Sequence, residues 1–196
     1  MKKTALFFGS FNPVHIGHLA LGNYIAEFAS VDEVRYIVSP HNPLKEETDL
    51  MDDFIRLEML RQSLSDYPKF TVSDIEFSLP KPSFTFQTLS VLSEQEPDTQ
   101  FILIIGSDNV DIFHKWNNYE WIMANYPILV YPRLGSSNRI PDNYSNMTLI
   151  DAPIIEVSST FIRQSIRAGK DVRFFLPEAA YKILNSTKAR KDEGTK

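Results

Sequence analysis

The chain has 196 residues, of which 43% are hydrophobic and 23% are charged, and its net charge is −5. This length and ordinary composition favour a single globular domain. The acidic balance argues against broad binding to nucleic acid, which needs a basic surface, but it allows a local positive pocket for a small anion. Because there is no cysteine, disulfides and thiolate chemistry are excluded.

No apolar stretch is long enough to span a membrane, and the apolar run after the two N-terminal lysines is too short for a signal peptide. We therefore expect a cytoplasmic protein with no membrane partner. The charged residues 188–196 lack apolar anchors, so we expect a disordered tail after one domain over 1–187. Whether the protein forms a homo-oligomer stays undecided, because an apolar stripe at a subunit interface looks the same in a sequence as one that faces the core.

Strand-like apolar runs alternate with helical patterns along the chain. Strands are predicted at 5–9, 33–38, 70–75, 100–106, 127–131 and 147–150. Helices are predicted at 17–29, 50–65, 84–95, 158–168 and 178–185. This alternation is typical of an α/β fold with a doubly wound parallel sheet, covered on both faces. Ligands of such sheets bind beyond the carboxyl ends of the strands.

Two of these helices carry more specific predictions. Thr48 or Asp49 can cap the helix at 50–65, and Ser83 can cap the helix at 84–95. The helix at 50–65 has one face near the helical period, formed by Phe54, Leu57, Leu60, Arg61 and Leu64.

The most informative segment is GSFNPVHIGH at 9–18, between the first predicted strand and the first predicted helix. A helix N-terminus has unpaired amides and partial positive charge, so it binds phosphate readily. His15 and His18 are three residues apart and can both face that terminus, while Gly9 and Gly17 allow the backbone to approach a ligand closely. The combination favours a nucleoside triphosphate site over a packed core histidine at an ordinary turn.

A second segment, SSTFIR at 158–163, starts another predicted helix. Its hydroxyls and free amides suit an anion, and Arg163 lies one turn further along, where it can reach the same anion. Alone, the segment fits an ordinary N-cap followed by a solvated arginine. With the first segment, it predicts two helix N-termini that hold one triphosphate.

Residues in the middle of the chain are candidates for the rest of a nucleotide site. Asp108 follows a strong strand and can accept hydrogen bonds from a ribose, help to hold a cation or cap the next helix. Lys45 can clamp a phosphate or lie in solvent. The backbone amides of Phe84 and Thr85 can bind a carboxylate, and Trp116 can stack on a flat ring or pack at the edge of the core.

Together these segments resemble the bacterial nicotinate-nucleotide adenylyltransferases of the HxGH nucleotidyltransferase superfamily, from position 6 to about 181. The motifs at 9–19 and 158–163 are similar to those of the superfamily. Three segments are similar to the narrower family: SFTFQTL at 83–89, the block from Phe101 to Trp116, and NPLK at 42–45. The resemblance implies a Rossmann-like nucleotidyltransferase domain over 1–187. It implies transfer of the adenylyl group of ATP to nicotinate mononucleotide, with Mg²⁺ assisting, giving deamido-NAD and pyrophosphate.

The resemblance also implies a role for particular residues. As catalytic groups on the ATP phosphates it implies His15, His18 and Arg163. For the rest of the ATP site it implies Gly9, Ser10, Phe11, Gly17, Gly106, Asp108, Ser158, Ser159 and Thr160. For nicotinate mononucleotide it implies Asn12, Lys45, Phe84, Thr85, Trp116 and Arg133. No cluster of metal-ligating side chains is expected.

The sequence departs from the family's common residues at Phe8, Asn12, Phe84 and Leu134. Phe84 stands where tyrosine is usual, which removes a hydroxyl near the pyridine. An alternative acceptor is nicotinamide mononucleotide or another phosphate monoester, such as phosphopantetheine. A second alternative is a nucleotide-binding sensor without catalysis. A tRNA-charging enzyme is excluded, because the chain has no room for an anticodon-binding domain.

Overall fold

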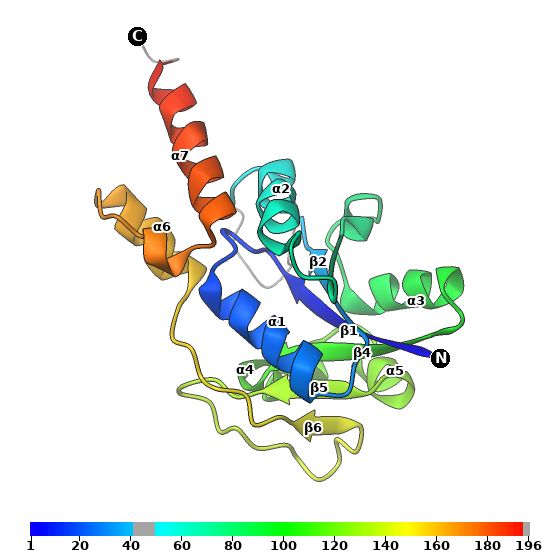
Figure 1. Cartoon of the computed structure of the whole chain (residues 1–196). Helices are drawn as coiled ribbons and strands as arrows, with labels where there is room; N and C mark the ends of the chain where they lie inside the picture. Colours follow the sequence, from blue (N-terminus) through cyan, green and yellow to red (C-terminus); the bar gives the residue numbers. More distant parts are fainter. Residues whose placement is uncertain (41–49, 194–196) are drawn as a thin grey trace.

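The computed structural model describes residues 1–40 and 50–193. Its centre is a six-stranded sheet in the order β3-β2-β1-β4-β5-β6, and every neighbouring pair is parallel (Figure 1). The strands are β1 (Lys2–Gly9), β2 (Glu33–Val38), β3 (Phe70–Ser73), β4 (Thr99–Gly106), β5 (Ile128–Tyr131) and β6 (Met147–Leu149). This order is that of a doubly wound nucleotide-binding fold, so the predicted Rossmann-like α/β architecture is confirmed.

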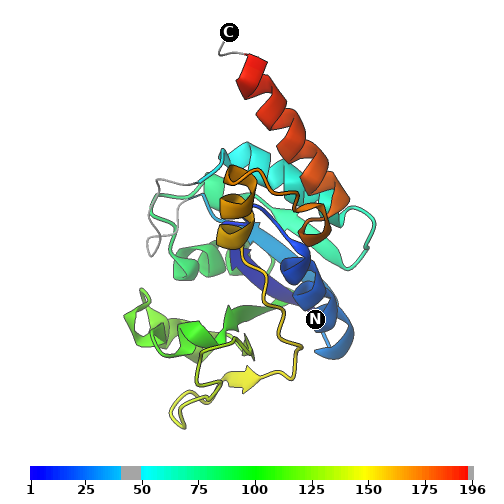
Figure 2. The ribbon, with the colours of Figure 1, turned by 90° about the vertical axis from the view of Figure 1, so that its left-hand side faces the viewer.

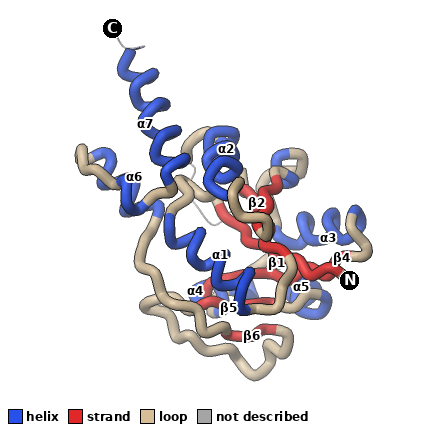
Figure 3. Tube along the Cα trace, viewed as in Figure 1, coloured by secondary structure: helices blue, strands red, loops and turns tan. Residues whose placement is uncertain are grey.

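Helices surround the sheet, as the tube view shows (Figure 3). They are α1 (Ile16–Phe28), α2 (Asp53–Leu64), α3 (Thr85–Gln95), α4 (Ser107–Val110), α5 (Tyr119–Asn125), α6 (Ser159–Arg167) and α7 (Glu178–Glu193). Short 3-10 turns lie at Ile75–Phe77, Phe113–Lys115 and Arg173–Phe175.

Alternate side chains of β1, β2, β4 and β5 enter two different cores. On β1, Ala5 and Phe7 join a cluster that includes the buried faces of α1 and α2, whereas Leu6 joins a cluster that includes α3 and α5. This period of two is what an extended backbone imposes. Because both faces are buried, the strands need continuous apolar sequences, which is why they could be located from the sequence.

The chain reverses its direction of winding between β1 and β4. From β1 the strand order continues through β2 to β3 on one side, and from β4 through β5 to β6 on the other. In open parallel sheets, ligands bind outside the carboxyl ends of the strands at such a switch point. The ends of β1 and β4, at Gly9 and Gly106, therefore mark where a site is expected.

The structure corrects several predicted boundaries. Helix α2 begins at Asp53, and Asp52 is its cap, accepting hydrogen bonds from the amides of Phe54 and Ile55. The predicted caps at positions 48 and 49 lie outside the described residues. At α3 the N-cap is Phe84 rather than Ser83. Polar residues alone do not locate these caps. Several polar residues precede α2, and the N-cap of α3 is a phenylalanine with an extended backbone and no side-chain capping bond.

The buried face of α2 also differs from the prediction. Phe54 is 70% exposed, whereas Arg56 is fully buried beside Leu57, Met59 and Leu60. The predicted face included Phe54 and Arg61, both of which are exposed, and it left out Arg56. The short helices α4 and α5 had no predicted counterpart, because each is too short for a periodic pattern to be read.

Helix α7 projects from the body of the molecule toward the C-terminus (Figure 2). It extends to Glu193, beyond the predicted end at position 185, so its last turns overlap the segment 188–196 that was expected to be a tail. Within the described part of the chain, no helix combines the length and the apolar character needed to cross a membrane.

Helix α1 packs closely against the sheet at Gly22. A Cβ atom built there would lie 1.9 Å from Oη of Tyr36, whose side chain is fully buried on β2. The Tyr36 hydroxyl also donates a hydrogen bond to the carbonyl of His18, at 3.2 Å. The glycine therefore sets how closely the helix that carries both histidines approaches the sheet.

Gly22→Ala should lower the free energy of unfolding by about 1–3 kcal/mol, despite the better helix propensity of alanine, because the buried tyrosine must move. Urea unfolding followed by tryptophan fluorescence measures the change. The double variant Gly22→Ala/Tyr36→Phe should be more stable than Gly22→Ala, because it lacks the overlapping hydroxyl. A Gly22→Ala protein as stable as the wild type would contradict this packing.

Candidate active site

A cavity of about 1130 Å³ opens at the carboxyl ends of the strands. Every predicted site residue within the described part of the chain lines it. These are Gly9, Ser10, Phe11, Asn12, His15, Gly17, His18, Phe84, Thr85, Gly106, Asp108, Trp116, Arg133, Ser158, Ser159, Thr160 and Arg163. Lys45 lies outside the described residues. The structure thus brings together segments from both halves of the sequence, as the position of the strand ends requires.

The loop between β1 and α1 presents both histidines to the cavity. His15 is the N-cap of α1, and its amide donates a hydrogen bond of 3.2 Å to Nδ1 of His18. The two rings are stacked, with their centroids 3.7 Å apart. Phe11 has a left-handed backbone, with φ at 43°, and its buried ring meets the His18 ring edge to face. The histidines are therefore held in place before any ligand binds.

His15 is only 5% exposed. Burial, together with the positive charge of Arg133, lowers the pKa of His15 from 6.5 to about 4. Its Nδ1 atom has no hydrogen-bond partner among the described residues. At neutral pH the ring is therefore uncharged, and a nearby anion would favour its protonation.

Hydrogen bonds hold helix α6 against the loop between β1 and α1. Ser158 is the N-cap of α6 and accepts a hydrogen bond from the amide of Phe161. The Ser159 hydroxyl donates to the carbonyl of Pro13, at 3.0 Å, and Nη1 of Arg163 donates to the carbonyl of Asn12, at 2.8 Å. The N-termini of α1 and α6 consequently lie beside one another at the cavity.

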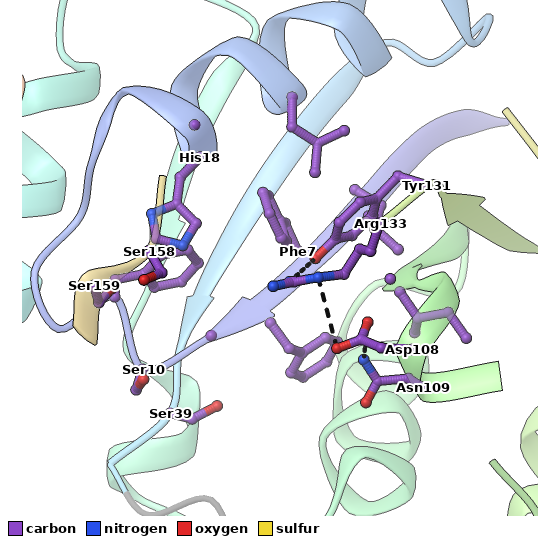
Figure 4. Close-up of a pocket in the computed structure, with 18 of the residues that line it drawn as sticks. Phe7, Ser10, His18, Ser39, Asp108, Asn109, Tyr131, Arg133, Ser158 and Ser159 are labelled. Atoms are coloured by element: carbon purple, nitrogen blue, oxygen red, sulfur yellow. Dashed lines mark hydrogen bonds and ion pairs between the residues drawn. The ribbon is translucent and has the colours of Figure 1, made fainter. Parts of the chain in front are cut away.

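The far wall of the cavity comes from β4, β5 and the loops that follow them (Figure 4). Nε of Arg133 lies 3.7 Å from a carboxylate oxygen of Asp108, and Nη1 lies 3.5 Å from the hydroxyl of Tyr131. A Cβ atom on Gly106 would lie 2.4 Å from Oδ1 of Asp108, so this glycine lets the carboxylate fold back toward the strand end. In Figure 4, His18 and Ser158 lie across the cavity from Asp108.

Another part of the wall comes from the start of α3 and from Trp116. Thr85 is the first residue of α3, so its amide belongs to the helix turn that lacks partners within the helix. Trp116 packs against Phe113 with the ring centroids 5.3 Å apart, and its Nε1 has no partner among the described residues. Oδ1 of Asn12 accepts a hydrogen bond from the amide of Met51, which ties this residue to a neighbouring loop. Its role toward nicotinate mononucleotide stays a prediction.

The cytidylyltransferase-like family model matches residues 6–165 of the chain. A protein of Bacteroides fragilis named probable nicotinate-nucleotide adenylyltransferase is 50% identical over 182 residues, covering 93% of this chain and 90% of its own. A protein of Cytophaga hutchinsonii with the same name is 45% identical over 186 residues, covering 95% of this chain and 97% of its own. The chain belongs to the nicotinate-nucleotide adenylyltransferases. It is therefore an enzyme, a nucleotidyltransferase, as the motifs at 9–19 and 158–163 predict.

Solved structures of this family share the fold. The nicotinic acid mononucleotide adenylyltransferase of Plasmodium falciparum complexed with NaAD aligns with a TM-score of 0.77 at 18% identity, covering 95% of this chain and 96% of its own. The same enzyme complexed with APC aligns with a TM-score of 0.75. At this identity the likeness shows the architecture, which is the doubly wound sheet described above.

One residue that organises the adenylyltransferase site was missed in the sequence. Arg56 of α2 is fully buried and donates hydrogen bonds to the carbonyls of Ser10 at 2.5 Å, Ser39 at 2.9 Å and Met51 at 3.1 Å. It also pairs with Asp53 of its own helix. One guanidinium thus ties the phosphate-side loop after β1 to the end of β2 and to the start of α2. Arg56 lies next to Leu57 and four residues before Leu60, and this spacing is the only local signal of its role.

Arg56→Lys should lower the free energy of unfolding by about 2–4 kcal/mol, because an ammonium cannot reach all of these carbonyls and leaves buried acceptors unpaired. Arg61→Lys is the matched control on the same helix, since Arg61 is half exposed and pairs with the exposed Asp74. The control should change stability by less than about 0.5 kcal/mol. Equal stabilities of the two variants in urea unfolding would contradict the role given to Arg56.

Proposed function

We propose that this enzyme transfers the adenylyl group of ATP to nicotinate mononucleotide, forming deamido-NAD and pyrophosphate, a step of NAD biosynthesis. The observation that carries the proposal is the pair of hydrogen bonds that hold α6 against the β1–α1 loop. They put two helix N-termini and the stacked His15 and His18 at one cavity. Such a site suits a chain of phosphates. The names of relatives up to 50% identical support the choice of acceptor.

At the ATP end, the proposed roles follow from charge and position. His15, His18 and Arg163 contact the phosphates and stabilise the negative charge that builds on the departing pyrophosphate. Phosphate binding raises the proton affinity of the buried His15, so we expect this ring to gain a proton with the nucleotide. Asp108 accepts hydrogen bonds from the ribose, and the remaining ATP-site residues given above line the phosphates and the nucleoside.

At the acceptor end, an acidic pyridine needs hydrogen-bond donors for its carboxylate and a flat surface for its ring. The first-turn amides of α3, at Thr85, and the indole of Trp116 provide these. Phe84 has no hydroxyl, so the hydrogen bonds to the carboxylate come from backbone amides, whereas a tyrosine would add its hydroxyl as a donor. Arg133, which lines the cavity just after β5, lies where it can attract the phosphate of the mononucleotide. The role of Lys45 stays a prediction.

The reaction we propose is a direct in-line displacement. A phosphate oxygen of nicotinate mononucleotide attacks the α-phosphorus of ATP, the new P–O bond forms, and the bond to the bridging oxygen breaks with its electron pair leaving on pyrophosphate. A phosphate monoester is largely ionised at neutral pH, so no strong general base is needed. Catalysis then comes from orientation and from charge stabilisation.

Mg²⁺ can enter this site bound to the phosphates of ATP. Within residues 1–40 and 50–193, no three His, Asp or Glu side chains gather as a metal site. Mg²⁺ commonly keeps its waters and is bound by substrate phosphates with one or two carboxylates, and Asp108 on the cavity wall can supply a carboxylate. When bound, the ion would neutralise phosphate charge.

Three further proposals complete this function. The region 1–187 acts as one nucleotidyltransferase domain, and the reaction takes place in the cytoplasm. The partners are the two small substrates rather than nucleic acid, in keeping with the net charge of −5. Self-association into a homo-oligomer is compatible with each of these.

His18→Ala should lower kcat at least ~10²-fold, because it removes a donor aimed at the developing charge. Pyrophosphate release from ATP with nicotinate mononucleotide measures kcat. His114→Ala is the matched control, since His114 is exposed and does not line the cavity. Near-normal turnover in a folded His18→Ala protein would contradict the proposed site.

A further inference from the structure

A buried carboxyl group lies beside the acceptor end of the cavity. Glu76, in the 3-10 turn Ile75–Phe77, is 1% exposed and lines the cavity together with Ser39 and Ser83. Carboxyl groups are almost never fully buried unless they are paired. Among the described residues no ion pair involves Glu76, so its burial calls for another explanation.

Within the described part of the chain, the polar groups around the Glu76 carboxyl are the hydroxyls of Thr88, Ser39 and Ser83 rather than a cation. Oε1 of Glu76 accepts a hydrogen bond of 2.8 Å from the hydroxyl of Thr88, a residue with no exposed surface. Burial raises the pKa of Glu76, against the opposing effect of the Thr88, Ser39 and Ser83 hydroxyls. Oε2 of Glu76 and the hydroxyl of Ser83 have no partner at hydrogen-bonding geometry among the described residues. The cluster joins the end of β2 to the segment that leads into α3.

Thr88 connects this cluster to the first turn of α3. It lies one turn into α3, and its amide reaches back toward the carbonyl of Phe84, the N-cap residue, at 3.4 Å. The side chain of Phe84 makes no capping hydrogen bond, so it does not fix the start of the helix. The Glu76–Thr88 bond is a buried polar contact that ties the first turn of α3 to a separate element. The direction of the Thr85 amide depends on where that turn lies.

We propose that Glu76 is a positioning residue for the acceptor, which it serves by holding the first turn of α3 through Thr88. This proposal rests on the function proposed above, since it concerns the part of the cavity assigned to nicotinate mononucleotide. Glu76 touches Thr88 rather than the reacting atoms. Its loss should therefore affect acceptor binding, whereas the ATP end, built on α1 and α6, should not change.

Thr88→Val tests the proposal, because valine keeps the shape of threonine and lacks its hydroxyl. We expect the KM for nicotinate mononucleotide to rise about 10-fold and the KM for ATP to change less than about twofold. Thr88→Ser keeps a hydroxyl and should restore most of the acceptor affinity. Calorimetric titration with nicotinate mononucleotide alone gives a second measurement that does not depend on turnover.

Glu76→Ala provides a second disruptive variant, and the double variant Glu76→Ala/Thr88→Val completes a cycle. If the two side chains act as one unit, the rise in acceptor KM in the double variant should be clearly less than the product of the two single effects. Thermal unfolding of every variant shows which of them remain folded at the assay temperature. Glu76→Gln keeps an oxygen that accepts from Thr88 and should bind the acceptor more tightly than Glu76→Ala.

The outcomes separate this proposal from the function on which it rests. A wild-type protein that releases no pyrophosphate with nicotinate mononucleotide would contradict the proposed function and this proposal with it. An active wild type in which Thr88→Val leaves the acceptor KM unchanged, or raises both KM values equally, would overturn only the positioning role of Glu76. Failure of Thr88→Ser to restore acceptor binding would also overturn it.

Discussion

The parallel direction of all six strands is the constraint on which the site depends. It brings the ends of β1, β2, β4 and β5 to one edge, so residues far apart in sequence line one cavity. The switch in winding between β1 and β4 leaves that edge open at the centre. Without this arrangement, the histidine segment would be an ordinary turn between a strand and a helix.

Long-range hydrogen bonds turn the open edge into a formed site. Arg163 donates to the loop at Asn12, 151 positions earlier in the chain, and Arg56 joins that same loop to the end of β2. Most of these contacts end on backbone carbonyls, so they fix the course of the loops around the cavity that His15 and His18 line. A site fixed in advance suits a reaction whose catalysis is mainly orientation and charge stabilisation.

The sequence predicted the features that local patterns encode. The apolar strands and the two motifs were located correctly, because the pattern of each lies in adjacent residues. The roles of Arg56 and Glu76 could not be predicted in this way. Their partners are carbonyls and hydroxyls brought near only by the folded sheet, and buried charged residues contradict the usual pattern of burial. The face of α2 was misjudged for the same reason, since the predicted face included the exposed Phe54 and Arg61 and left out the buried Arg56.

The preference for an acidic acceptor is the central claim, and a comparison of acceptors tests it most directly. Pyrophosphate release would be measured with ATP and Mg²⁺, and with either nicotinate mononucleotide or nicotinamide mononucleotide at matched concentrations. Because the start of α3 offers amide donors, the account predicts a kcat/KM at least ~10-fold higher for the acid than for the amide. An equal or higher kcat/KM with the amide would contradict the account.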